Sequence, residues 1–265
     1  MTTDAQVADW AVADATIRRI GILVMASLVS GVVVGGVGGR IVMRISALAA
    51  PDHMLRRLTE NGNRIGEFTL EGTIAIMIFV GGLMALVGTG IVVGSDPWLA
   101  WMGRFRVVGL ALVVLAAGGA AGGFESIDFL ILEPRALNVA MFVALHVLFA
   151  IGVVAIAAVL DARLPVEGER VMIFYMVALT PLTLGALATL AFFSLESFCG
   201  CEPQRGIAAL FIVLWAATVV AFIAPATDRM PAWIVRFFRP TGYACLGLLT
   251  ATGLWRTWEQ IALIL

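Results

Sequence analysis

The chain contains no lysine, and all 17 of its basic residues are arginine. Without a lysine amine no Schiff base with a carbonyl compound can form on a side chain, which excludes a retinal protein of the rhodopsin type. Charge of either sign is also scarce, because charged residues make up 13% of the chain, against about 25% in an ordinary soluble domain. The formal net charge of −1 leaves no basic surface for a nucleic-acid partner.

The chain is instead rich in apolar residues. They account for 61% of the 265 residues, more than one water-soluble core could hide. Several runs reach about 20 residues, the length at which a helix crosses the ~30 Å hydrocarbon layer of a bilayer. The sequence therefore predicts an all-α fold, a polytopic transmembrane helical bundle.

Seven apolar segments can be drawn as spans within a single domain, residues 1–265. The last is the weakest, because Arg256 and Glu259 follow its short apolar run, and six spans remain if it does not cross. The expected spans are approximately 20–43, 72–94, 107–124, 136–160, 171–195, 207–226 and 241–262.

The distribution of arginine predicts the orientation. The first 20 residues carry Asp4, Asp9 and Asp14 and lack the basic start and the cleavage site of a secretory signal, so we expect this segment to be retained. Cytoplasmic flanks are enriched in arginine, which predicts a multi-pass protein of the bacterial inner (cytoplasmic) membrane with its N-terminus inside. Nine arginines then lie inside: Arg18, Arg19, Arg104, Arg106, Arg163, Arg170, Arg229, Arg236 and Arg239. When the first outer loop is left out of the count, three arginines lie on the outer side: Arg135, Arg205 and Arg256.

The first outer loop, residues 44–67, departs from this rule because it carries four arginines. Either the hydrophobic hairpin overrides the charge rule, or the topology is wrong, or these cations are paired or bind something anionic. Pro51 and Asp52 are typical of a helix start, and Asn61-Gly62 is typical of a stop. We therefore expect a short interfacial helix in this loop.

Arginines and glutamates flank the loop at matching spacings. Arg40 and Arg44 end the first span, Glu67 and Glu71 begin the second, and residues four apart share a helix face. Because the two spans are antiparallel neighbours, two Arg–Glu pairs could form and lower the cost of holding charge near lipid. Together with Arg64, this cluster is either a structural clasp or an outward-facing site for an anionic ligand or lipid headgroup.

Glycines at four-residue spacing, Gly31, Gly35 and Gly39, precede these arginines and predict close helix packing. The stretch GGRIVMR and the downstream GEFTLEGT resemble uncharacterised polytopic bacterial membrane proteins in which GRxxMR is followed by FTxxGT. The resemblance covers about the first third of the chain. It implies a shared hairpin and no activity.

His146 lies near the middle of the fourth predicted span. A histidine at this depth can hydrogen-bond a neighbouring helix, relay protons, or supply a single axial ligand to haem or chlorin. A haem held between two histidines is disfavoured, because the other histidine, His53, lies in the outer loop. No cofactor is required by the sequence, and no set of metal ligands stands out.

Two further features belong to the fifth predicted span and the loop after it. Thr180, Pro181 and Thr183 predict a kink or a cavity, because proline leaves a backbone carbonyl without its helical partner. Cys199 and Cys201 lie in the outer loop, where their spacing favours a local disulfide or a pair of free thiols over a zinc site.

Three classes of function remain. Glycine-rich packing and the near absence of charge within the spans favour a non-catalytic subunit or scaffold of a membrane complex. The alternative is a transporter or channel for an apolar, amphiphilic or anionic small molecule. Less favoured is an interfacial lipid-headgroup enzyme with Glu67 or Glu71 as base, because no nucleophile–base set supports catalysis. The expected partners are membrane lipids and other membrane subunits or further copies of the chain.

Overall fold

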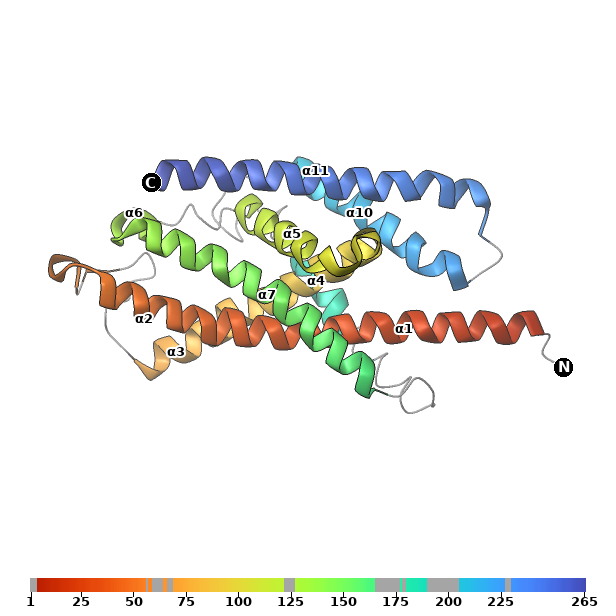
Figure 1. The fold of residues 1–265 in the computed structure, drawn as a ribbon, viewed down its shortest axis with the longest axis horizontal. Coiled ribbons are helices and arrows are strands. Elements are labelled where there is room, and N and C mark those ends of the chain that lie inside the picture. Colours follow the sequence, from red (N-terminus) through yellow and green to blue (C-terminus); the bar gives the residue numbers. More distant parts are fainter. Residues whose placement is uncertain are drawn as a thin grey trace.

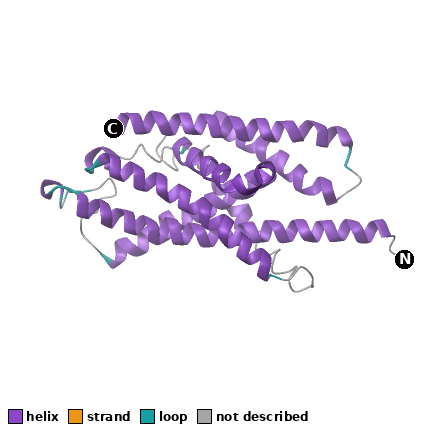
Figure 2. Cartoon of the chain, in the orientation of Figure 1, coloured by secondary structure: helices purple, strands orange, loops and turns teal. Residues whose placement is uncertain are grey.

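A computed structural model describes residues 4–55, 57–58, 64–65, 69–121, 127–164, 177, 180–189, 205–226 and 230–265. Every named element in these ranges is a helix, as Figure 2 shows. The prediction of an all-α helical bundle is confirmed.

The first helix is much longer than its predicted span, 20–43. It runs without a break from α1 (Asp4–Ser30) through a π-helical stretch, η1 (Gly31–Gly38), into α2 (Gly39–Ala49). Figure 1 shows α1 reaching beyond the other helices at its N-terminal end. The helix ends where Ala50 turns extended ahead of Pro51, since the residue before a proline disfavours helical geometry. Among the described residues of the first outer loop, a 3₁₀ turn, η2 (Asp52–Met54), lies where the short interfacial helix was expected.

The glycine-rich part of this helix packs directly on the second one. A Cβ added at Gly31 would lie 2.3 Å from the Cα of Ala85, and one added at Gly35 would lie 3.0 Å from the Cβ of Met84. At Gly39 the nearest atoms would be 3.8 Å away, which is ordinary contact. Close approach is therefore required at the first two positions, in the way that small residues let membrane helices meet.

The second and third helices form a hairpin. α3 (Leu70–Ile76), η3 (Met77–Gly81) and α4 (Gly82–Leu99) are continuous, and the Thr69 side chain caps the start by accepting a hydrogen bond from the Gly72 N–H (3.1 Å). A short turn, η4 (Ala100–Phe105), leads into α5 (Arg106–Ala120). Gly103 takes φ +50° in this turn, a conformation that favours glycine.

The remaining elements follow in chain order. A short α6 (Ile127–Ile131) precedes α7 (Arg135–Arg163), which crosses α1 in Figure 1. Residues 180–189 are helical, and α10 (Arg205–Ile223), η5 (Ala224–Ala226) and α11 (Ala232–Ile264) follow. Figure 1 shows α11 lengthwise along one side of the bundle.

α11 is held close to α5 by small residues on both helices. A Cβ added at Gly253 would lie 2.3 Å from the Ala116 carbonyl oxygen, and the Gln260 Nε2 donates to the Gly119 carbonyl (3.1 Å). At the other half of α11, Gly242 accommodates the ring of Trp98 from α4. The Trp98 Nε1–H donates to the Thr218 hydroxyl of α10 (3.0 Å), so this ring joins three helices.

Four helical stretches are long and apolar enough to cross a membrane: Asp14–Ala49, Leu70–Ala120, Arg135–Arg163 and Gly206–Ile223. The second contains the predicted span 72–94 and, up to Ala120, most of the predicted span 107–124, and the two are joined at η4. The fifth predicted span, 171–195, falls largely outside the described residues. The seventh, 241–262, lies in α11, which is not among these four stretches. The apolar helices identify the chain as a membrane protein.

Candidate functional site

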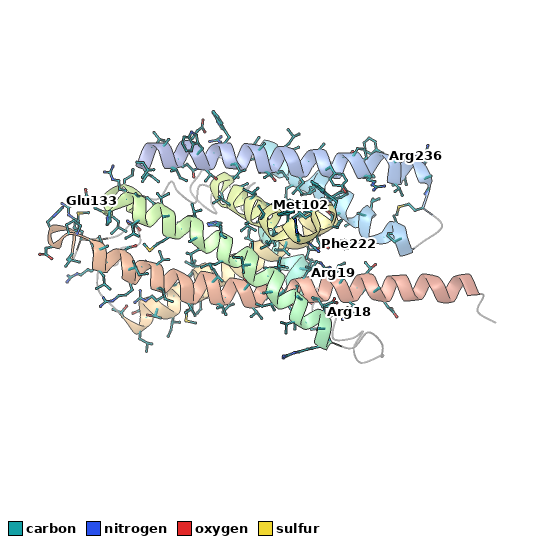
Figure 3. The ribbon with its side chains drawn as sticks, in the orientation of Figure 1. Arg18, Arg19, Met102, Glu133, Phe222 and Arg236 are labelled. Atoms are coloured by element: carbon teal, nitrogen blue, oxygen red, sulfur yellow. The ribbon has the colours of Figure 1, made fainter. Side chains whose placement is uncertain are left out.

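Arg18 on α1 clasps the C-terminal end of α7. Its guanidinium donates to the Asp161 carboxylate (2.5 Å), to the Asp161 carbonyl (2.6 Å) and to the Leu164 carbonyl (3.1 Å). The last carbonyls of a helix have no partner within it and carry partial negative charge, so a cation there is favourable. This contact fixes where α7 crosses α1, the region in which Figure 3 labels Arg18 and Arg19.

The next residue of α1, Arg19, belongs to a second ionic cluster. The Arg19 Nη2 donates to the Asp96 Oδ1 of α4 (3.2 Å), and the Nη2 of Arg106, the first residue of α5, pairs with the same oxygen. The Asp96 side chain is 9% exposed, whereas those of Arg19 and Arg106 are 33% and 25% exposed. Two half-buried cations therefore share one buried carboxylate, and this triad has a formal charge of +1.

A cavity of about 250 Å³ opens beside the triad. It lies among α1, α4, α5 and α7, the helices that the two ionic clusters join. Its polar lining residues are Arg19, Ser95, Asp96, Arg106 and Asp161, and its apolar ones are Leu23, Val92, Leu99, Leu110, Val153, Val154, Ala157 and Ala158. We call it the arginine cavity.

The side chains of the arginine cavity supply donors that suit an oxyanion. Each guanidinium has five N–H donors in a planar fork that matches carboxylate and phosphate oxygens, and the pair with Asp96 engages one terminal nitrogen of each. The Ser95 hydroxyl donates to the Val92 carbonyl (3.2 Å), within its own helix. Among the described residues no group of three His, Cys, Asp or Glu could hold a metal ion.

His146 is buried between α7 and α5. Its Nδ1 lies 2.9 Å from the Phe142 carbonyl, which can only accept, so Nδ1 carries the proton and donates within its own helix. A Cβ added at Gly118 would lie 2.4 Å from the Nε2. The Nε2 therefore lies beside the α5 backbone at Gly118. The choice among a hydrogen bond to a neighbouring helix, a proton relay and an axial ligand stays a prediction.

The predicted arginine–glutamate cluster lies at the opposite end of the bundle from the arginine cavity. Arg40 is half-buried on α2, whereas Arg44, Arg64 and Glu71 are exposed. Glu67 lies outside the described residues, so the choice between clasp and ligand site stays a prediction. At this end of the bundle a hydrogen bond joins α2 to α7. The buried Ser46 hydroxyl of α2 donates to the Asn138 side-chain oxygen of α7 (2.6 Å).

The remaining residues that the sequence analysis singled out lie in the fifth predicted span and in the loop after it. Thr180 and Thr183 are exposed, Pro181 is half-buried, and none of the three lines the arginine cavity. Residues 178–179, on which a kink at Pro181 would depend, are outside the described ranges. Cys199 and Cys201 are outside them as well, so the disulfide prediction concerns residues whose structure is not described.

Sequence reasoning missed the arginine cavity, although one signal was present. Asp96 is the single acidic residue between Glu71 and Glu125, and it directly follows an apolar run. The positive-inside rule uses Arg19 and Arg106 only as indicators of orientation. Only the pairing of α1, α4 and α5 brings the three charges together.

Comparisons with protein-family models, with curated proteins and with solved structures found no match to this chain.

Proposed function

We propose that this chain is a non-catalytic, multi-pass membrane protein that binds an anionic group in the arginine cavity. The observation that carries the proposal is the triad, in which Arg19 and Arg106 share the buried Asp96 carboxylate beside an open volume of about 250 Å³. Such a protein would serve as the ligand-binding subunit of a membrane complex, or as a binding protein of its own.

Electrostatics favours an anion over a cation or a neutral ligand. The triad has an excess positive charge, and its guanidinium groups are partly removed from water. Desolvated charge is costly unless it is paired, and the second pair, Arg18 with Asp161, is already neutral. An oxyanion between Arg19 and Arg106 would neutralise the excess and accept charge-assisted hydrogen bonds, which are the stronger kind.

The positive-inside rule supports a cytoplasmic location for the arginine cavity in a bacterial inner membrane. The described arginines at this end of the bundle outnumber those that the rule assigns to the outer side away from the first loop; they are Arg18, Arg19, Arg104, Arg106, Arg163, Arg236 and Arg239. A ligand would then arrive from the cytoplasm or from the inner leaflet. The N-terminal extension of α1 would project on the same side.

The test is the binding of inorganic phosphate to the full chain in nanodiscs, measured by titration calorimetry. We expect Arg106→Gln to weaken binding roughly tenfold or more, because a hydrogen bond to a charged group contributes about 1.5–3 kcal/mol. Arg19→Gln should act in the same direction. Arg104→Gln is the matched control, since this exposed arginine lies two residues away and its guanidinium stacks over the Phe105 ring (4.9 Å).

Circular dichroism and gel filtration would establish that each variant is folded. If the wild type takes up neither phosphate nor a carboxylate, or if Arg104→Gln weakens binding as much as Arg106→Gln, the arginine cavity is not an anion site.

A further inference from the structure

The walls of the arginine cavity are arranged in two layers. Each charged residue has an apolar lining residue four positions deeper on its own helix: Leu23 below Arg19, Val92 below Asp96, Leu110 below Arg106, and Ala157 below Asp161. Residues four apart lie on the same helix face, about 6 Å apart along the axis. Four helices therefore present charge at one level and hydrocarbon at the next, in the same register.

The apolar layer continues inward. Val153 lies a further turn below Ala157 and is 1% exposed, and Leu23, Val92 and Leu110 are all buried. No described charged residue lines this deeper part of the cavity. An inorganic anion would use the charged layer alone, and the apolar layer, whose members belong to the main hydrophobic core, lies directly beneath it.

We propose that the ligand is a single-chain amphiphile, with one carboxylate or phosphate head held by Arg19 and Arg106 and a short apolar chain in the deeper layer. This inference rests on the proposed function, because it identifies the ligand of the same site. Carboxylate and phosphate share the chemistry that a guanidinium fork recognises, so the head is assigned as an oxyanion.

The volume of the arginine cavity suits one short apolar chain. About 250 Å³ lies just below the ~300–1,000 Å³ of pockets for drug-sized molecules. A phospholipid with two long chains does not fit within this volume. The structure thus favours a small amphiphile that enters with its chain inward.

The test is a chain-length series of linear carboxylates from acetate to octanoate, titrated into the full chain in nanodiscs. Empty nanodiscs give the blank for partition into lipid. Each buried methylene contributes about 0.8 kcal/mol, so we expect affinity to rise about fourfold per methylene until the chain fills the cavity. Alkyl phosphates of the same lengths, run in parallel, distinguish the two heads by which series binds more tightly.

Ala157→Leu fills the apolar layer without touching the charges. We expect it to weaken octanoate binding more than acetate binding and so to flatten the chain-length series. Ala155→Leu is the matched control, because Ala155 is exposed on the same helix and does not line the cavity. Val154→Phe is a second filling variant in case Ala157→Leu does not fold.

The outcomes separate the two proposals. A rising series that Ala157→Leu flattens and Ala155→Leu preserves supports the amphiphile. Acetate binding with equal affinity along the whole series overturns the amphiphile and leaves the anion site intact. Failure of every carboxylate and phosphate to bind overturns both.

Discussion

Replacing Gly253 by alanine should push α11 away from α5. The added Cβ would lie 2.3 Å from the Ala116 carbonyl oxygen and 2.7 Å from its carbonyl carbon. These are backbone atoms of α5, which cannot swing aside as a side-chain end can, so one helix must shift. Overpacking of this kind costs about 1–3 kcal/mol.

Gly247→Ala isolates that cost. Gly247 lies in the same helix, and a Cβ there would meet nothing within 4 Å. Both substitutions gain the same helix propensity, about 0.8–1.0 kcal/mol, so this contribution cancels when the two variants are compared. The difference in stability between them should therefore be the overpacking cost alone, about 1–3 kcal/mol.

Thermal unfolding of both variants in one nanodisc preparation, followed by circular dichroism, measures the difference. For a chain of this size 1 kcal/mol corresponds to about 2–4 °C, so Gly253→Ala should melt roughly 2–12 °C below Gly247→Ala. Gly119→Ala approaches the same interface from α5, where its Cβ would clash with the Thr257 hydroxyl, and should be at least as harmful. Equal midpoints for Gly253→Ala and Gly247→Ala would refute the close packing of α11 on α5.

Two further substitutions probe contacts between helices. Trp98→Phe removes the hydrogen bond to the buried Thr218 hydroxyl and should lower stability by about 1 kcal/mol, measured by thermal unfolding. Trp101→Phe is the control, because this ring is exposed, and it should change stability little. Equal effects of the two substitutions would contradict a stabilising role of the Trp98–Thr218 hydrogen bond. Arg18→Gln removes the clasp on the end of α7 and should lower stability by about 1–2 kcal/mol, less than for a fully buried pair because the Asp161 side chain is half exposed. An unchanged midpoint for Arg18→Gln would show that the clasp does not stabilise the crossing of α1 and α7.

Hydropathy was sufficient to predict the fold class, because about 20 apolar residues in a row have few alternatives to a membrane-crossing helix. The close approach at Gly31 and Gly35 follows from the same reasoning, since small residues at four-residue spacing form one flat face. Helix ends were less predictable. α1 continues far N-terminal of residue 20 because nothing in that segment breaks a helix, whereas hydropathy marks only its apolar part.

The arginine cavity could not be predicted because it depends on which helices are neighbours. Asp96 and Arg106 are ten residues apart, on either side of a turn whose geometry Gly103 sets, and Arg19 comes from a helix far away in the sequence. Spacing along one helix, which drew attention to Arg40 and Arg44, does not reveal such a meeting. A lone acid at the end of an apolar run, as at Asp96, is a better indicator of a charged partner on another helix than the spacing of Arg40 and Arg44.

The most direct test of the anion site is to locate an anion in it. Crystals of the full chain soaked in selenate should show an anomalous selenium peak between Arg19 and Arg106, with oxygens about 3 Å from both guanidinium groups. The same soak of Arg106→Gln crystals should lack this peak. Selenate bound at other surfaces, with only water beside Arg19 and Arg106, would contradict the assignment of the arginine cavity as an anion site.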